Sequence, residues 1–222
     1  MRGDFNIDLY LPGQIICVGM NYRSHVKEQD GRFPGKPVLF SKAKGCVIRN
    51  NEDIVCPLEV RELDYEVELA VIIAEKMKSV PVKKVNDYIY GYTIINDVTA
   101  RDIQQSEHQW FRAKSFDTFG PIGPVVVPKK KIADPNNLFI RSYVNGELRQ
   151  DSNTGEMILD VYQLLSYISR SITLYEGDMV ATGTPAGVAA FMRDKVFLKD
   201  RDEVACEIEN IGRLTNRVRN AC

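Results

Sequence analysis

The feature of this sequence that most constrains its fold is the close succession of short strand-like stretches along 222 residues. The clearest is LFIRSYVNGELRQ, in which two alternating runs flank Asn145-Gly146, the strongest short-range hairpin signal. Few segments have helical spacing, and no internal repeat or glycine/serine linker divides the chain. The pattern therefore predicts a mostly β (α+β) fold, a sandwich or rolled sheet with a few flanking helices, rather than a doubly wound fold.

Helices are expected in only three places. The segment MILDVYQLLSYISRSI has apolar residues on one stripe, including Ile158 and Val161, and predicts the longest helix. The segment SVPVKKVNDYIY, residues 79–90, predicts a shorter helix, and RSHVKEQDG, residues 23–31, predicts one or two turns. Strands are expected in most of the remaining apolar runs, among them residues 15–18, 62–73, 91–96 and 202–220.

The expected strand ELDYEVELAVII, residues 62–73, carries an unusual row of acids. Side chains alternate along a strand, so Asp64, Glu66 and Glu68 share a face, with neighbours roughly 7 Å apart. One interpretation is an outer face on which the acids are solvated. The uninterrupted apolar run that follows favours a buried strand, where a hard divalent cation would relieve the repulsion between the carboxylates. The strand alone leaves both interpretations open.

Composition limits the classes of function. The net charge is −1, which gives no indication of a nucleic-acid partner or of an anionic membrane surface. No apolar run approaches the roughly 20 residues of a membrane span, and the amino terminus does not resemble a secretory signal. Five widely spaced cysteines without a Cys-x-x-Cys pair argue against a zinc ribbon or a disulfide framework. We expect a cytoplasmic protein with reduced thiols.

Other polar residues recur where strands are expected to end, and each has an ordinary interpretation. His25 and Glu28 are three apart, a spacing that can pair imidazole with carboxylate on a helical turn, or can occur by chance on a surface helix. Asp97 follows an apolar strand, where it could point into a cleft or cap a helix. Lys114 alone would be a surface lysine, and the ATGTPAGV loop with Thr184 would be a tight turn.

Together these segments resemble the fumarylacetoacetate hydrolase family. The resemblance runs from about residue 15 to the carboxyl terminus. It is carried, in order, by CVGMNYRSHVKE, PVLFSKAKG, ELDYEVELAVII, GYTIINDVTARDIQ, AKSFDTFGPIGP, VNGELRQ and GDMVATGTPAGV. Seven ordered matches are specific. The chain is most similar to the short members of that family, which implies a lead-in segment at residues 1–14 and one catalytic domain of mixed β-sandwich roll type at residues 15–222.

The resemblance also implies roles for individual residues. The metal ligands of the family fall on Glu66, Glu68 and Asp97, which favours the cation interpretation of the acidic strand and a Mg²⁺ or Mn²⁺ cofactor. The catalytic positions are the His25–Glu28 pair and Lys114. The substrate-pocket positions are Gln104 and Thr184, and residues 25–36 match a mobile lid. A homodimer is expected on the resemblance alone.

The implied activity is chemistry on a small keto acid through a metal-stabilised enolate. Hydrolysis of the C–C bond of an acylpyruvate and decarboxylation of oxaloacetate both fit. Isomerisation of a 2-hydroxyhepta-2,4-diene-1,7-dioate type of substrate is an alternative, and a non-catalytic metal-binding oligomer is an alternative of another class. The sequence departs from the family pattern at Met20, Ala43 and Ala189, which weakens any inference about the particular substrate.

Overall fold

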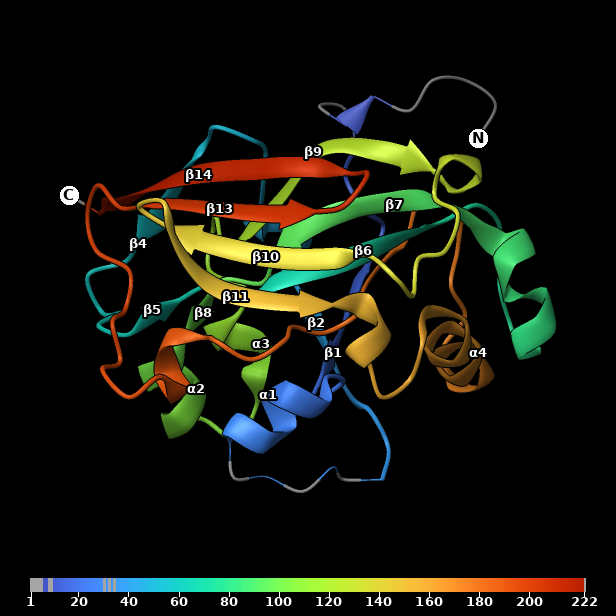
Figure 1. Cartoon of the computed structure of the whole chain (residues 1–222), viewed down its shortest axis with the longest axis horizontal. Helices are drawn as coiled ribbons and strands as arrows, with labels where there is room; N and C mark the ends of the chain where they lie inside the picture. The colour runs from blue at the N-terminus through green and yellow to red at the C-terminus, as the bar shows by residue number, and fades with distance from the viewer. Residues whose placement is uncertain (1–5, 8–9, 30, 32, 34, 222) are drawn as a thin grey trace.

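Two β-sheets and a short strand pair form the frame of the computed structural model, which describes residues 6–7, 10–29, 31, 33 and 35–221 (Figure 1). Among these residues the larger sheet has seven strands, in the order β2 (Val38–Lys42), β1 (Ile15–Gly19), β12 (Met179–Ala181), β6 (Val67–Ile73), β7 (Ile89–Asn96), β9 (Gly120–Pro128) and β3 (Val47–Ile48). The second sheet has five, in the order β11 (Glu147–Asn153), β10 (Phe139–Val144), β13 (Glu203–Ile208), β14 (Gly212–Asn220) and β4 (Asp53–Cys56). The separate pair is β5 (Leu63–Asp64) with β8 (Thr99–Ala100).

Helices are short and lie around the sheets. The α-helices are α1 (Arg23–Glu28), α2 (Arg101–Ser106), α3 (Trp110–Ala113) and α4 (Val161–Ser171). The 3₁₀ turns are η2 (Lys44–Cys46), η3 (Val82–Tyr88), η4 (Lys129–Lys131), η5 (Thr154–Glu156) and η6 (Ala189–Phe191). Figure 1 shows α1, α2 and α3 gathered on one side of the molecule and α4 at one end. No helix in the described ranges is long and apolar enough to cross a membrane.

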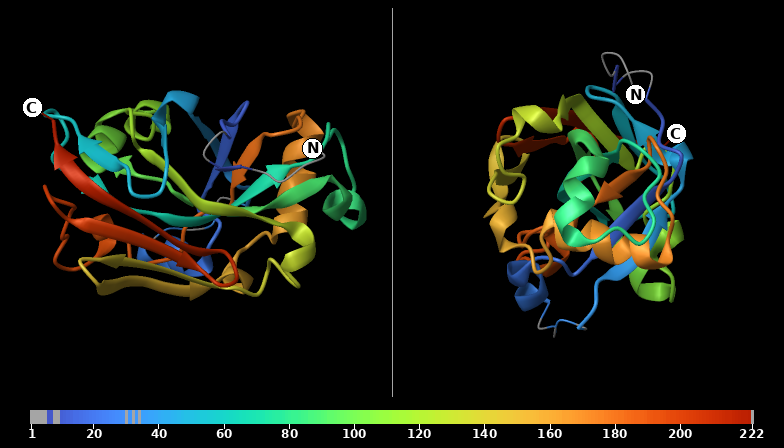
Figure 2. Two further views of the ribbon diagram at one scale, coloured as in Figure 1. Left: turned by 90° about the horizontal axis from the view of Figure 1, so that it is seen from above. Right: turned by 90° about the vertical axis from the view of Figure 1, so that its right-hand side faces the viewer.

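The largest core cluster lies between the two sheets. It combines Leu69 and Ile94 of the larger sheet with Ile140 and Leu214 of the smaller one, and Leu165 of α4 closes one end. The view from above in Figure 2 shows these sheets as two layers. Alternating strand residues place one apolar face of each sheet inward, which is how a sandwich buries its core. The predicted mostly β sandwich is confirmed, whereas the boundary between residues 1–14 and 15–222 stays a prediction.

The hairpin and the longest helix were also predicted correctly. Asn145 and Gly146 have φ values of 52° and 80°, as a tight turn between β10 and β11 requires. Helix α4 begins after Asp160, whose side chain accepts the N–H of Gln163 in a capping box. Ile158, expected on the apolar stripe of this helix, lies before its first turn.

The prediction of a helix over residues 79–90 was wrong in type and extent. The segment forms the 3₁₀ helix η3, in which only Val85 is buried, and Ile89 already belongs to β7. Two valines, an asparagine and an aspartate give these seven residues a low α-helical propensity. Pro81 precedes η3 and β7 begins directly after it, so the segment has room for only about two helical turns.

The acidic segment does not form one continuous strand. Strands β5 and β6 are separated at Tyr65 and Glu66. The side-chain oxygen of Asn96 accepts the Glu66 N–H at 2.9 Å, and that of Gln150 accepts the Val67 N–H at 3.1 Å. These bonds satisfy backbone donors that would otherwise be buried and unpaired.

Candidate active site

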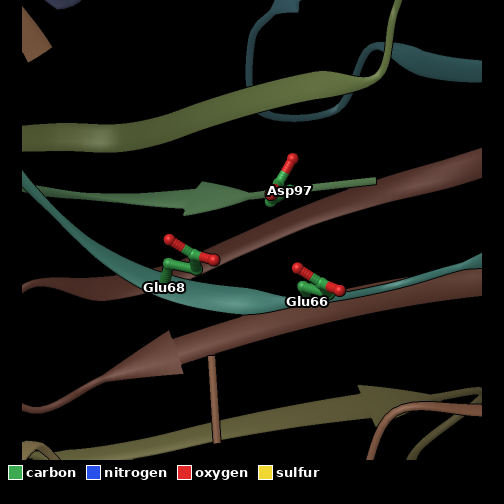
Figure 3. Close-up of side chains that lie close together, drawn as sticks. All are labelled: Glu66, Glu68 and Asp97. Carbon is green, nitrogen blue, oxygen red and sulfur yellow. The ribbon is translucent and has the colours of Figure 1, made fainter. Parts of the chain in front are cut away.

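Three acidic side chains meet where β6 and β7 pair. Glu66 precedes β6, Glu68 lies within it, and Asp97 follows β7 (Figure 3). The antiparallel register pairs Val67 with Asn96, and it brings Asp97 opposite Glu66, whose carbonyl accepts the Asp97 N–H at 2.9 Å. One oxygen from each carboxylate lies within 4.8 Å of the others, and all three residues are buried. The interpretation of a solvated outer face was therefore wrong.

Three buried cations surround these acids. Lys114 Nζ lies 2.9 Å from Glu66 Oε2, 2.7 Å from Asp97 Oδ2 and 2.8 Å from Thr99 Oγ1. The interpretation of Lys114 as a surface lysine was wrong, as was that of Asp97 as a helix cap, because α2 begins at Arg101 without a side-chain cap. Lys42 donates to Asp97 Oδ1 at 2.6 Å, and Arg101 donates to Glu66 Oε1 at 2.5 Å.

The two glutamates have opposite electrostatic environments. Burial alone would raise the pKa of Glu66, but the charges of Lys114 and Arg101 outweigh it and lower the pKa to about 2. Burial raises the pKa of Glu68 well above its usual range, and the nearby Asp97 and Glu66 raise it further. The Gly183 N–H donates to Glu68 Oε2 at 2.8 Å, but none of the ion pairs among the described residues includes Glu68.

This donor set fits a hard cation. Carboxylate oxygens are the ligands that Mg²⁺, Mn²⁺ and Ca²⁺ prefer, and the cluster offers three of them in a buried position. A cation would also supply the positive charge that Glu68 lacks. The cluster could therefore bind a metal ion.

The predicted histidine–glutamate pair forms on α1. His25 Nδ1 lies 2.6 Å from Glu28 Oε1, and the second oxygen of Glu28 accepts the Gly187 N–H at 2.9 Å. An ionised carboxylate only accepts, so this contact assigns the proton to Nδ1 and leaves Nε2 as the basic nitrogen. His25 is buried rather than displayed on a surface helix, so the pairing is not a chance surface contact.

One pocket of about 220 Å³ brings most of the predicted residues together. Its lining includes His25, Glu66, Glu68, Gln104, Lys114 and Thr184. Glu28 and Asp97 do not line it, and they lie behind His25 and Lys114 as their hydrogen-bond partners. Gln104 is oriented by Arg101, whose Nη1 donates to Gln104 Oε1 at 2.9 Å. The side chain of Thr184 donates to the Val67 carbonyl at 2.9 Å.

The sequence interpretation missed Arg101 and Lys42, and it left open whether Asp64 is solvated or supports the metal ligands. Asp64 is fully buried and accepts hydrogen bonds from the N–H groups of Ala189 and Ala190 and from Arg101 Nε. The only available signal was the alternation that placed Asp64 on the same face as the glutamates. Lys42 gave no signal, since its strand β2 is separated from the acids along the chain.

The departures from the family pattern lie in different places. Met20 lines the pocket and adopts a φ of 60°, whereas Ala43 lies outside the pocket lining and donates its N–H to Ser115 Oγ. Ala189 contacts Asp64 through its backbone N–H, which any residue except proline could provide. The predicted lid over residues 25–36 includes residues 30, 32 and 34, which lie outside the described residues, and it stays a prediction.

Comparison with known proteins decides the family. Residues 14–219 match the model of the fumarylacetoacetate hydrolase C-terminal domain. The chain belongs to the fumarylacetoacetate hydrolase family. It is 46% identical over 208 residues to the mitochondrial oxaloacetate tautomerase Fahd2a of Rattus norvegicus, a match that covers 93% of this chain and 66% of the rat protein. The chain therefore spans about two thirds of that relative's length.

Solved structures of the family agree with the fold. The fumarylacetoacetate hydrolase of Exiguobacterium antarcticum is 40% identical, with a TM-score of 0.89, and the match covers all of this chain and 85% of that one. The 2-hydroxyhepta-2,4-diene-1,7-dioate isomerase of Mycobacterium marinum is also 40% identical, with a TM-score of 0.84, and the match covers 95% of this chain and 76% of that one. These relatives are named for a tautomerase, a hydrolase and an isomerase, so the family alone does not select a reaction.

Proposed function

We propose that this chain is a metal-dependent enzyme that interconverts the enol and keto forms of a small α-keto acid, with oxaloacetate as its substrate. The observation that carries the proposal is the convergence of a carboxylate cluster, a lysine and a paired histidine in one pocket of about 220 Å³. That volume lies below the usual range for drug-sized ligands and suits a compact acid. The 46% identity to an oxaloacetate tautomerase supports this choice among the family reactions.

In this proposal Glu66, Glu68 and Asp97 hold a divalent cation, Mg²⁺ or Mn²⁺. When bound, the cation supplies Lewis-acid stabilisation of the negative charge that develops on the substrate oxygens. Lys114 adds positive charge beside the same position, because its ammonium group is already fixed between two of these carboxylates.

His25 moves the proton. Its Nε2 can take a proton from the enol oxygen or from C3 of the keto form and return it to the other atom, so the reaction consumes no water. Glu28 holds the ring in one tautomer and stabilises the imidazolium that forms during the transfer. The Gly187 N–H in turn fixes Glu28.

A second candidate is the hydrolysis of short acylpyruvates. The His25–Glu28 pair favours it, since a paired imidazole can also activate water for attack on a carbonyl. The isomerase reaction named for the Mycobacterium marinum relative needs the same groups, and a non-catalytic metal-binding protein is the remaining alternative.

One panel of assays tests the proposal. Enolic oxaloacetate is added to the protein with Mg²⁺, with Mn²⁺ or with a chelator, and the loss of the ultraviolet absorbance of the enol is followed. Release of CO₂ and cleavage of short acylpyruvates are measured in parallel. We expect metal-dependent acceleration of enol loss without matching CO₂ release. No turnover of any α-keto acid above background would contradict the proposal and favour the non-catalytic alternative.

A further inference from the structure

An aromatic ring stands at the edge of the pocket in a defined position. Phe191 ends η6, lines the pocket and remains 40% exposed. Its ring contacts the imidazole of His25 edge to face, with the centroids 5.9 Å apart and the planes at 69°. The ring also contacts Arg101, whose guanidinium carbon lies 6.0 Å from the ring centroid. The ring thus touches both His25 and the arginine that pairs with Glu66.

Asp64 holds the backbone of the turn that carries Phe191. The carboxylate of Asp64 accepts the N–H groups of Ala189 and Ala190 at 2.9 and 3.0 Å, which holds the turn that carries Phe191. The same carboxylate accepts Arg101 Nε at 2.8 Å. One buried carboxylate therefore anchors both the turn that carries Phe191 and the guanidinium group of Arg101.

The direction of the substrate follows from the proposed function, on which this inference rests. In the proposed complex the carboxylate and keto oxygens of an α-keto acid face Glu66 and Glu68, because these residues would hold the cation that attracts those oxygens. The proton at C3 must lie within reach of His25 Nε2. Any carbon beyond C3 then extends past the imidazole of His25, and Phe191 is the side chain that packs against that imidazole.

We propose that Phe191 is the residue that limits the length of the substrate's carbon chain, and that it selects short α-keto acids over longer ones. A rigid apolar wall discriminates through the methylene groups that it accepts or rejects. One methylene in such a pocket changes selectivity by about 10–200-fold. Discrimination at the first carbon that meets the ring should therefore be at least about tenfold.

The test measures binding of straight-chain 2-oxo acids from pyruvate to 2-oxoheptanoate, each with Mg²⁺. Binding does not depend on which reaction the enzyme catalyses. The fluorescence of Trp110 reports it, since this is the one tryptophan of the chain and it lines the pocket. Calorimetry gives an independent affinity. The variants are Phe191→Ala and Phe191→Trp, with Phe111→Ala as the matched control, because Phe111 is 50% exposed and does not line the pocket.

We expect the wild-type protein to bind short acids and to lose at least about tenfold in affinity at one chain length. Phe191→Ala should remove that loss, Phe191→Trp should move it to a shorter acid, and Phe111→Ala should behave as wild type. An unchanged length limit in Phe191→Ala would overturn the inference, as would a limit removed by Met20→Ala instead. Both results leave the proposed function intact. Failure of every 2-oxo acid to bind the metal-loaded wild type would overturn both.

Discussion

The same substitution at two glutamates of the acidic segment should have opposite effects on the stability of the metal-free protein. Glu66 forms two buried ion pairs, with Lys114 at 2.9 Å and Arg101 at 2.5 Å. Glu66→Gln breaks both, although Lys114 keeps Asp97 and Arg101 keeps Asp64 as partners. The cost should therefore fall below the about 3–5 kcal/mol that is typical when a buried ion loses its partner. Glu68 has no cation partner among the described residues and only the Gly183 N–H as donor. Its carboxylate therefore destabilises the fold at neutral pH.

The size of the Glu68 effect follows from linkage. Burial raises the pKa of Glu68 in the folded state well above its usual value of 4.5, and the charges of Asp97 and Glu66 raise it further. A raised folded pKa gives stability that is complete below the unfolded pKa and is lost as pH rises toward the folded pKa. Each unit by which the folded pKa exceeds the unfolded pKa is worth about 1.4 kcal/mol, so the charge of Glu68 lowers the stability of the metal-free fold as the pH rises between the two values. Glu68→Gln should remove this penalty, and the gain should disappear near pH 4.5.

Urea unfolding at several pH values, in chelator and in Mg²⁺, measures these differences. Without metal, Glu68→Gln should be more stable than wild type and Glu66→Gln less stable. Both variants should lose the stabilisation that Mg²⁺ gives the wild type, because each lacks one carboxylate of the cluster. A Glu68→Gln variant that is destabilised in chelator as strongly as Glu66→Gln would refute the charge reasoning. Unchanged Mg²⁺ stabilisation in both variants would refute the metal site.

Three further predictions follow from the site and the family. Lys114→Met should lower the free energy of unfolding in chelator by about 3–5 kcal/mol. Mg²⁺ should stabilise this variant more than it stabilises the wild type, and equal stabilisation of both in urea unfolding would contradict this. His25→Ala should slow enol loss and acylpyruvate cleavage by about 10²–10⁴-fold and oxaloacetate decarboxylation less, with metal content unchanged. An unchanged rate of enol loss would contradict the proton-transfer role, and equal losses in all three assays would mean that His25 acts in a step common to the three reactions. From the family resemblance we expect a homodimer, and a monomer mass by light scattering at micromolar concentration would argue against it.

The sequence predicted the parts of the fold that depend on local signals. The hairpin at Asn145-Gly146 and the capped helix after Asp160 have turn and cap residues that specify their geometry. The failures occurred where tertiary contacts replaced local ones. The acidic strand is broken because the side chains of Asn96 and Gln150, distant in sequence, take over its backbone donors.

The site was predictable as a set of residues but not as a balance of charge. Glu66 and Glu68 could be placed on one face from strand alternation, and the register of β6 with β7 then brings Asp97 opposite. Lys42 and Lys114 enter the same cluster from β2 and from the residue after α3. No periodicity connects those segments to the acids, so their burial could not be read from the sequence.

The charge balance of the site links the stability of the metal-free protein to the attraction of an anionic substrate. Asp64, Glu66, Glu68 and Asp97 are four buried carboxylates, and Lys42, Arg101 and Lys114 are three buried cations, so the ionised cluster carries one net negative charge. In that state the pocket repels an anionic substrate. A divalent cation would reverse the sign and leave one net positive charge, which would attract the carboxylate that all α-keto acids carry beside the keto group. If the proposed function holds, the uncompensated Glu68 would be both the group that makes the metal-free protein less stable and the group that makes the attraction of substrate depend on the metal.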